Sequence, residues 1–189
     1  MLRGEKVGLR ARIESDSVVL HAELYDDVAT WLRMDTRPWR PIPAGSSADP
    51  FRVAEPNDEF EDFAVVELAE GEALAGSAVL WGLDRHNRSA HVGISLLPSC
   101  RGRGLGLDAV KVMCEYGFAI RGLNRLAIET FSDNAPMLRA AERSGFVREG
   151  LLRQAAWVSG HFLDEVVLGL LAEDWNRAKR KGPASEPKG

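Results

Sequence analysis

A glycine-rich turn with two arginines is the part of this sequence whose residue types most clearly predict a binding site. It reads Arg101-Gly102-Arg103-Gly104-Leu105-Gly106, between an alternating apolar run that ends at Leu97 and a helical pattern that continues past Leu107. Glycines let the backbone curl tightly, with its N–H groups pointing inward. A turn of this kind at the positive end of a helix binds phosphate, and arginine adds fixed positive charge. We therefore expect a polyphosphorylated ligand.

Two common nucleotide-binding patterns do not fit this turn. Its glycines lack the full GxGxxG spacing of dinucleotide-binding folds, and no Gly-Lys-Ser/Thr follows as in a Walker loop. The histidine and cysteine spacings indicate neither a metal site nor a disulfide framework, so we expect a reduced, cytoplasmic protein without a metal. The residues concerned are His21, His86, His91, His161, Cys100 and Cys114.

Length and composition indicate one globular domain. The chain has 189 residues, of which 45% are hydrophobic and 28% charged, and its net charge is −4. A weakly acidic chain has no bulk attraction for nucleic acid or anionic membranes. No apolar run approaches the roughly 20 residues that span a bilayer. We therefore expect neither a nucleic-acid nor a membrane partner.

The periodicity of apolar residues predicts the elements that position the turn. Expected strands lie at 7–11, 63–68, 73–81, 90–97, 125–131, 147–157 and 162–171, and expected helices at 16–24, 27–34, 105–120 and 134–144. The proline-rich stretch 36–62 is expected to be irregular. This order predicts an α+β fold, with one mixed, mostly antiparallel sheet of about seven strands flanked by about four helices. We expect one domain over 1–175 and a flexible basic tail over 176–189.

The turn, its position and this element order resemble the GCN5-related N-acetyltransferase (GNAT) superfamily. The turn matches that family's Arg/Gln-x-x-Gly-x-Gly/Ala signature, Asn134 follows the next strand, and Ser144-Gly145-Phe146 stands where the family carries Gly-Phe. The segment Glu149-Gly150-Leu151-Leu152-Arg153, with Asp164 and Glu173-Asp174-Trp175, resembles the branch that acetylates ribosomal-protein N-termini. The resemblance covers roughly residues 1–175.

The resemblance implies an acetyl-CoA-dependent N-acetyltransferase of the GNAT fold. The strand Ser95-Leu96-Leu97 would splay from its neighbour and bind the pantetheine arm, residues Gly102 to Leu107 would wrap the pyrophosphate, and Asn134 would contact the cofactor. A backbone N–H near Leu96 or Leu97 would stabilise the oxyanion. The acceptor would be a primary amine, either a protein N-terminus of the ribosomal-protein type or a small-molecule amine, and it would attack the thioester directly in a ternary complex.

The resemblance also suggests catalytic residues. Glu129 stands where some family members place a catalytic glutamate, which would act as the base; the alternative is a strand glutamate that faces solvent or pairs with an arginine. Many members carry a tyrosine acid where this chain has Ala141. Ser95 and His91 are weaker candidates for proton transfer. With no acid at position 141, a catalytically silent CoA-binding module is the alternative function.

Aromatic residues outside the predicted core are candidates for the acceptor cleft. Trp39 lies in the irregular stretch, where the apolar residues show no helical or strand spacing that would predict burial, and Trp157 lies near a predicted hairpin. Trp31, a third candidate, is expected to pack on its own helix. The resemblance leaves the acceptor and the oligomeric state open, and a homodimer through the last strands is a reasonable expectation.

Overall fold

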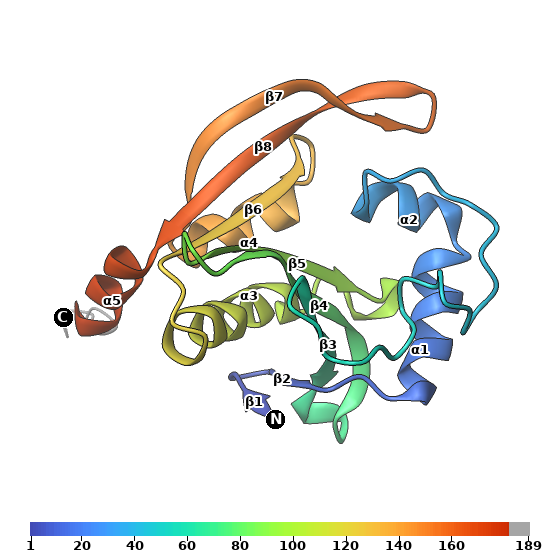
Figure 1. Cartoon of the computed structure of the whole chain (residues 1–189), viewed down its shortest axis with the longest axis horizontal. Coiled ribbons are helices and arrows are strands. Elements are labelled where there is room, and N and C mark those ends of the chain that lie inside the picture. Colours follow the sequence, from blue (N-terminus) through green and yellow to red (C-terminus); the bar gives the residue numbers. More distant parts are fainter. Residues whose placement is uncertain (182–189) are drawn as a thin grey trace, which may run out of the picture.

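The computed structural model describes residues 1–181, and they form one eight-stranded sheet with helices around it (Figure 1). The sheet order is β1-β2-β3-β4-β5-β6-β8-β7. All neighbours are antiparallel except β5 and β6, which are parallel. The strands are β1 (Leu2–Arg3), β2 (Val7–Arg10), β3 (Phe60–Glu67), β4 (Ala73–Asp84), β5 (Ser89–Leu96), β6 (Arg125–Phe131), β7 (Val147–Val158) and β8 (His161–Leu171).

The helices lie between these strands and after the last one. Turns of π-helix continue two of the α-helices, α1 into η1 and α3 into η4, and short 3₁₀ turns follow β3 and β5. The helical elements are α1 (Glu14–Leu20), η1 (His21–Tyr25), α2 (Val28–Met34), η2 (Leu68–Glu70), η3 (Pro98–Cys100), α3 (Leu105–Glu115), η4 (Tyr116–Ile120), α4 (Ala135–Arg143) and α5 (Ala172–Lys181).

The α+β prediction is confirmed, with differences at the two ends of the chain. The sheet gains β1, whose two residues are too few to show an apolar period. The helix α5 continues the ordered chain past the predicted domain end at Trp175, and its charged residues kept it from being predicted as a helix. The remainder of the predicted tail, residues 182–189, lies outside the described residues.

The two faces of the sheet have different roles. On one face α3 packs against β2, β4 and β5, and α4 packs against α3 and β6. Because side chains alternate along a strand, Leu80, Val92 and Ile128 belong to this buried core, whereas Val79 and Trp81 point to the other face. The helices α1 and α2 and the irregular segment before β3 lie together at one end of the molecule (Figure 1).

The strands β5 and β6 separate in the middle of the sheet. Their pairing runs from Ser89 opposite Arg125 to His91 opposite Ala127 and then stops. On its other side β5 stays paired with β4 as far as Leu96. The backbones are close there, since a Cβ on Gly76 would lie 2.2 Å from the Ser95 carbonyl oxygen. The predicted splay of the strand that contains Ser95 is therefore present.

The strands β7 and β8 form a long hairpin that arches away from the rest of the sheet (Figure 1). The edge strand β7 is exposed along almost all of its length, and its register with β8 shifts between Leu152 and Ala156. Its exposed side chains include Leu151, Leu152 and Trp157. An edge strand with exposed apolar side chains is unusual in a monomer.

Candidate active site

A cavity of about 720 Å³ lies on the face of the sheet opposite α3. Its floor is a set of strand residues that share this face by their alternation and register. Its walls come from α2, α4 and the segment 35–54. The floor residues are Phe60, Asp62, Ser77, Val79, Trp81, Gly93, Ser95, Glu129, Phe131 and Glu165.

The gap between β5 and β6 leaves backbone groups available at this cavity. The Leu97 N–H donates to the Ala75 carbonyl at 2.9 Å, so it has a partner on β4. Because hydrogen-bonded pairs alternate along an antiparallel ladder, the Leu96 N–H points the other way, toward the gap. Of the two expected oxyanion donors, Leu97 therefore has its N–H engaged on β4, whereas the Leu96 N–H faces the gap.

The glycine-rich turn has the conformation that its sequence predicts. Gly102 and Gly104 have φ values of +77° and +81°, which glycine adopts at little cost, and Gly104 immediately precedes α3. Within residues 1–181, no protein acceptor receives a hydrogen bond from the N–H groups of residues 102–107. A row of free N–H groups at a helix N-terminus is a phosphate-binding arrangement.

The positive charge at this turn differs from the prediction. Arg103 forms an ion pair with Glu67, and Arg101 donates to the Leu96 carbonyl at 3.2 Å. A further cation comes from outside the turn, since Lys6 Nζ donates to the Arg103 carbonyl at 3.0 Å and lies beside Gly104. Arg101 and Lys6 are therefore cations beside this turn that form no ion pair with a carboxylate of residues 1–181, whereas Arg103 is paired with Glu67.

The buried carboxylate of Asp108, in the first turn of α3, holds Lys6 in this place. It accepts backbone N–H bonds from Glu5 at 3.2 Å, Lys6 at 2.7 Å and Val7 at 2.9 Å. These contacts tie the link between β1 and β2 to the start of α3. Lys6 and Asp108 are about a hundred positions apart in the sequence, so no local signal could have revealed this contact.

Glu129 projects from β6 into the cavity beside two other titratable side chains. Its Oε1 lies 3.6 Å from Nδ1 of His91, which stacks on Trp81 with ring centroids 4.1 Å apart. Glu165 on β8 is its diagonal neighbour on the same face. Burial, and next the charge of Glu129, raise the pKa of Glu165 above its ordinary value. Glu129 forms no ion pair with an arginine or lysine of residues 1–181.

Ser95 and Asn134 both line the cavity. Asn134 also has a structural role as the N-cap of α4, because its side-chain oxygen accepts from the Met137 N–H at 3.4 Å. Its amide nitrogen donates to Thr130 Oγ1 at 2.9 Å. Asn134 therefore lines the cavity with both groups of its side-chain amide hydrogen-bonded.

Neither of the two tyrosines of the chain lines this cavity. The Tyr25 hydroxyl donates to the Arg40 carbonyl at 2.7 Å, and burial raises the pKa of Tyr116 to about 12. Ala141, at the position where many family members carry tyrosine, is fully buried in the core. The structure therefore offers no phenolic acid for the leaving group.

The tryptophans differ most from the sequence-based prediction. Trp39 turns inward, packs against the core and donates its indole N–H to the Tyr25 carbonyl at 3.0 Å. Trp157 lies on the exposed hairpin, edge to face with Phe162, and it does not line the cavity of this chain. Trp31 lines the cavity, although of the three tryptophans it was the one we expected to pack on its own helix. Trp31 is 3% exposed and donates to the Arg37 carbonyl at 3.2 Å.

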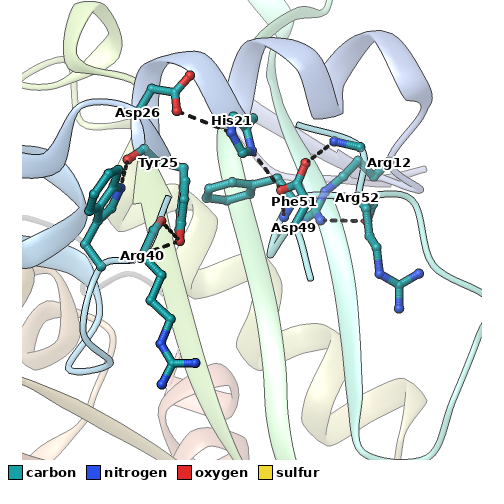
Figure 2. A network of polar contacts seen from close by, with 10 residues as sticks. Arg12, His21, Tyr25, Asp26, Arg40, Asp49, Phe51 and Arg52 are labelled. Carbon is teal, nitrogen blue, oxygen red and sulfur yellow. Dashed lines mark hydrogen bonds and ion pairs between the residues drawn. The ribbon is translucent and has the colours of Figure 1, made fainter. Parts of the chain in front are cut away.

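The segment that walls the cavity contacts a set of mostly buried polar side chains (Figure 2). His21 lies between Asp49, 3.0 Å from its Nδ1, and Asp26, 3.3 Å from its Nε2. Arg12 donates to Asp62 at 3.1 Å and to Ser77 Oγ at 2.9 Å. The members of this set are scattered over several elements, so no local sequence pattern predicts it.

Other expectations concern metals, membranes and cysteines. Among residues 1–181 no group of three or more His, Cys, Asp or Glu side chains is placed to hold a metal ion. No helix in that part of the chain is long and apolar enough to cross a membrane. Cys100 and Cys114 are both buried and free, and burial raises the pKa of the Cys114 thiol to about 12.

Comparisons with known proteins agree with this geometry. The family model described as acetyltransferase (GNAT) domain matches residues 6–147. The chain is 31% identical over 139 residues to the Bacillus subtilis protein named "Putative ribosomal N-acetyltransferase YdaF", covering 71% of this chain and 76% of the relative. It is 28% identical over 108 residues to a spermidine N(1)-acetyltransferase of Vibrio cholerae, covering 57% of this chain and 62% of the relative.

Solved structures share the fold. The spermidine N-acetyltransferase from Vibrio cholerae in complex with CoA and spermine superimposes with a TM-score of 0.72 at 19% identity, covering 90% of this chain and 98% of that one. Mutant forms of a spermidine/spermine N-acetyltransferase from the same organism give a TM-score of 0.75 at 21% identity. The family model over residues 6–147 and the 31% identical relative show that the chain belongs to the acetyltransferase (GNAT) family and is an acetyl-CoA-dependent N-acetyltransferase.

Proposed function

We propose that this enzyme transfers the acetyl group to a primary amine held in the cavity, by direct attack in a ternary complex. The observation that carries the proposal is the gap between β5 and β6, which leaves the Leu96 N–H without a partner on β6, next along the chain to the cavity residue Ser95. A thioester in the gap and an amine in the cavity would meet beside Ser95 and Glu129. Most of the acceleration then comes from juxtaposing two bound reactants.

The donor side of the site is proposed from residues with free backbone groups. The N–H groups of residues 102–107 would bind the pyrophosphate, with Arg101 and Lys6 adding charge. The backbone of Leu96, which faces the gap, would bind the pantetheine arm, and Asn134 would contact it from α4. The Leu96 N–H would stabilise the oxyanion that forms when the amine attacks the thioester carbonyl.

We assign Glu129 the role of the base that removes a proton from the acceptor ammonium. It lines the cavity, its side chain is 33% exposed, and Glu165 and His91 lie beside it. Glu129 and Glu165 thus bring two carboxylates to the same part of the cavity. Ser95, which lines the cavity, is a candidate for returning a proton to the leaving thiolate, and a water molecule can do the same.

Two classes of amine fit the proposal, because the relatives differ in the substrates that their names give. One relative is named for a ribosomal substrate and another for spermidine. A thiol-release assay with acetyl-CoA separates these classes, using spermidine in one arm and a short peptide with a free N-terminus in the other. Turnover of an amine supports the proposal. The proposal is contradicted if no thiol is released with spermidine, with the peptide or with any amine of a wider panel.

A second function, a CoA-binding module without catalysis, is favoured by the buried Ala141 and by the absence of both tyrosines from the cavity lining. Tight binding of CoA with no turnover of any amine would support this alternative. We also propose that residues 1–175 form one catalytic domain.

We also propose that the β7–β8 hairpin mediates self-association. Its exposed apolar side chains lie on an edge strand that has no neighbour on its outer side among the described residues. A second copy of the chain would cover them, and Trp157 would then lie at a subunit interface.

A further inference from the structure

The part of the cavity wall formed by residues 47–52 has little backbone support. This stretch, the wall segment, contributes Ser47, Asp49, Pro50, Phe51 and Arg52 to the cavity. Its backbone hydrogen bonds within residues 1–181 are local, from Asp49 to Ser46 at 3.0 Å and from Arg52 to Asp49 at 3.3 Å. Side chains must therefore fix where it lies over the sheet.

Asp49 is the first of these fixed points. Its side chain is completely buried, and its two oxygens accept from the Gly45 N–H at 2.7 Å and the Phe51 N–H at 2.8 Å. The His21 ring, 2% exposed, lies 3.0 Å from the same carboxylate. Burial would raise the pKa of Asp49, but His21 and the two N–H groups outweigh it and hold that pKa below its ordinary value.

Arg12 is the second fixed point, and it joins the wall segment to the sheet. Its guanidinium donates to the Arg52 carbonyl at 3.4 Å and lies 5.6 Å from the Phe51 ring centroid. The same group donates to Asp62 on β3 and Ser77 on β4, both in the cavity floor. Figure 2 shows His21 and Arg12 on the two sides of Asp49 and Phe51.

We propose that His21 and Arg12 are positioning residues that hold the wall segment over the cavity and thereby set the affinity for the amine acceptor. The inference rests on the proposed function, because it assumes that the cavity receives the amine. Neither residue belongs to the glycine-rich turn or to the gap between β5 and β6. Their removal therefore affects acceptor binding and leaves acetyl-CoA binding intact.

The test compares two carboxylates that contact the same histidine. Asp49→Asn removes the buried partner of His21, and Asp26→Asn removes the exposed one. We expect Asp49→Asn to raise the KM of the better acceptor, spermidine or the N-terminal peptide, by about tenfold. Its KM for acetyl-CoA and its kcat should stay within about twofold of wild type, and Asp26→Asn should match wild type throughout.

Hydrogen exchange provides a readout that does not need turnover. In Asp49→Asn the amides of the wall segment should exchange at least about tenfold faster, while those of α3 keep their wild-type rates and show that the protein remains folded. Unchanged exchange of the wall segment overturns the proposal, and so does an equal rise in KM for acetyl-CoA and acceptor.

The two proposals fail differently. Faster exchange with an unchanged acceptor KM overturns the positioning role and leaves the proposed acetyltransferase reaction standing. A wild-type enzyme that turns over no amine contradicts the proposed reaction, and exchange of the wall segment then decides whether the buried network holds it. His21→Gln, which keeps a polar side chain of similar size, should reproduce the result of Asp49→Asn.

Discussion

The Oε1 atom of Glu129 lies 3.6 Å from Nδ1 of His91, and the two residues stand on the two strands that separate at the active site. The His91 Nδ1 is buried and has no hydrogen-bond partner within residues 1–181. A carboxylate in this setting can take a proton from an amine in the cavity and has an imidazole next to it.

Glu129→Gln tests this assignment. The amide has nearly the same shape and cannot act as a base, so kcat should fall by about 10²–10⁴-fold. The dissociation constant for acetyl-CoA should remain within about twofold of wild type, because Glu129 is not part of the glycine-rich turn. Steady-state kinetics and calorimetric titration measure the two quantities. A wild-type kcat at the pH optimum would eliminate Glu129 as the base.

Glu165→Gln should stabilise the protein at neutral pH. The pKa of Glu165 is raised in the folded state, so the folded protein binds more protons than the unfolded one between the ordinary pKa of about 4.3 and the raised value. The contribution of Glu165 to the free energy of unfolding is therefore fully present below its ordinary pKa. It is lost as the pH rises from the ordinary pKa through the raised pKa. The variant should therefore have a higher Tm than wild type at pH 7 and an equal Tm near pH 4. Equal Tm values at both pH values would contradict the prediction.

Trp157→Ser tests the self-association surface. If the hairpin is an interface, replacing a large exposed apolar side chain there should weaken assembly by about 2 kcal/mol or more. Light scattering after gel filtration measures the molar mass, and Trp81→Ser, a cavity residue that is also exposed, is the matched control. A wild-type protein that is monomeric at high concentration would disprove this interface.

Local sequence patterns predicted the features that are built from contiguous residues. The turn at 101–106 and its helix follow from glycine spacing and apolar periodicity. The residues of β5 alone do not predict where its pairing with β6 ends, because that point depends on the path of β6. Only the family resemblance predicted this separation of the two strands. Lys6, Arg12 and Glu165 reach the site from elements distant in sequence, so their types alone did not identify them.

The tryptophans show a second reason for failure. Trp39 has no core period because it lies in an irregular segment, yet its ring packs inward beside Tyr25. Trp31 does have a core period, and it lines the cavity as well as packing on Tyr25. Periodicity reports which side of an element is covered, and it does not report whether the cover is protein or a ligand cavity.

The central claim is that the turn at 101–106 binds the pyrophosphate of acetyl-CoA, and a matched pair of glycine variants tests it. Gly102 and Gly71 have φ values of +77° and +64°, and neither has an atom within 4 Å of an added Cβ. Valine is strained equally at both positions, but only Gly102 lies in the turn. By calorimetric titration, Gly102→Val should weaken acetyl-CoA binding by at least about tenfold while Gly71→Val binds like wild type. Wild-type affinity in Gly102→Val would contradict the account.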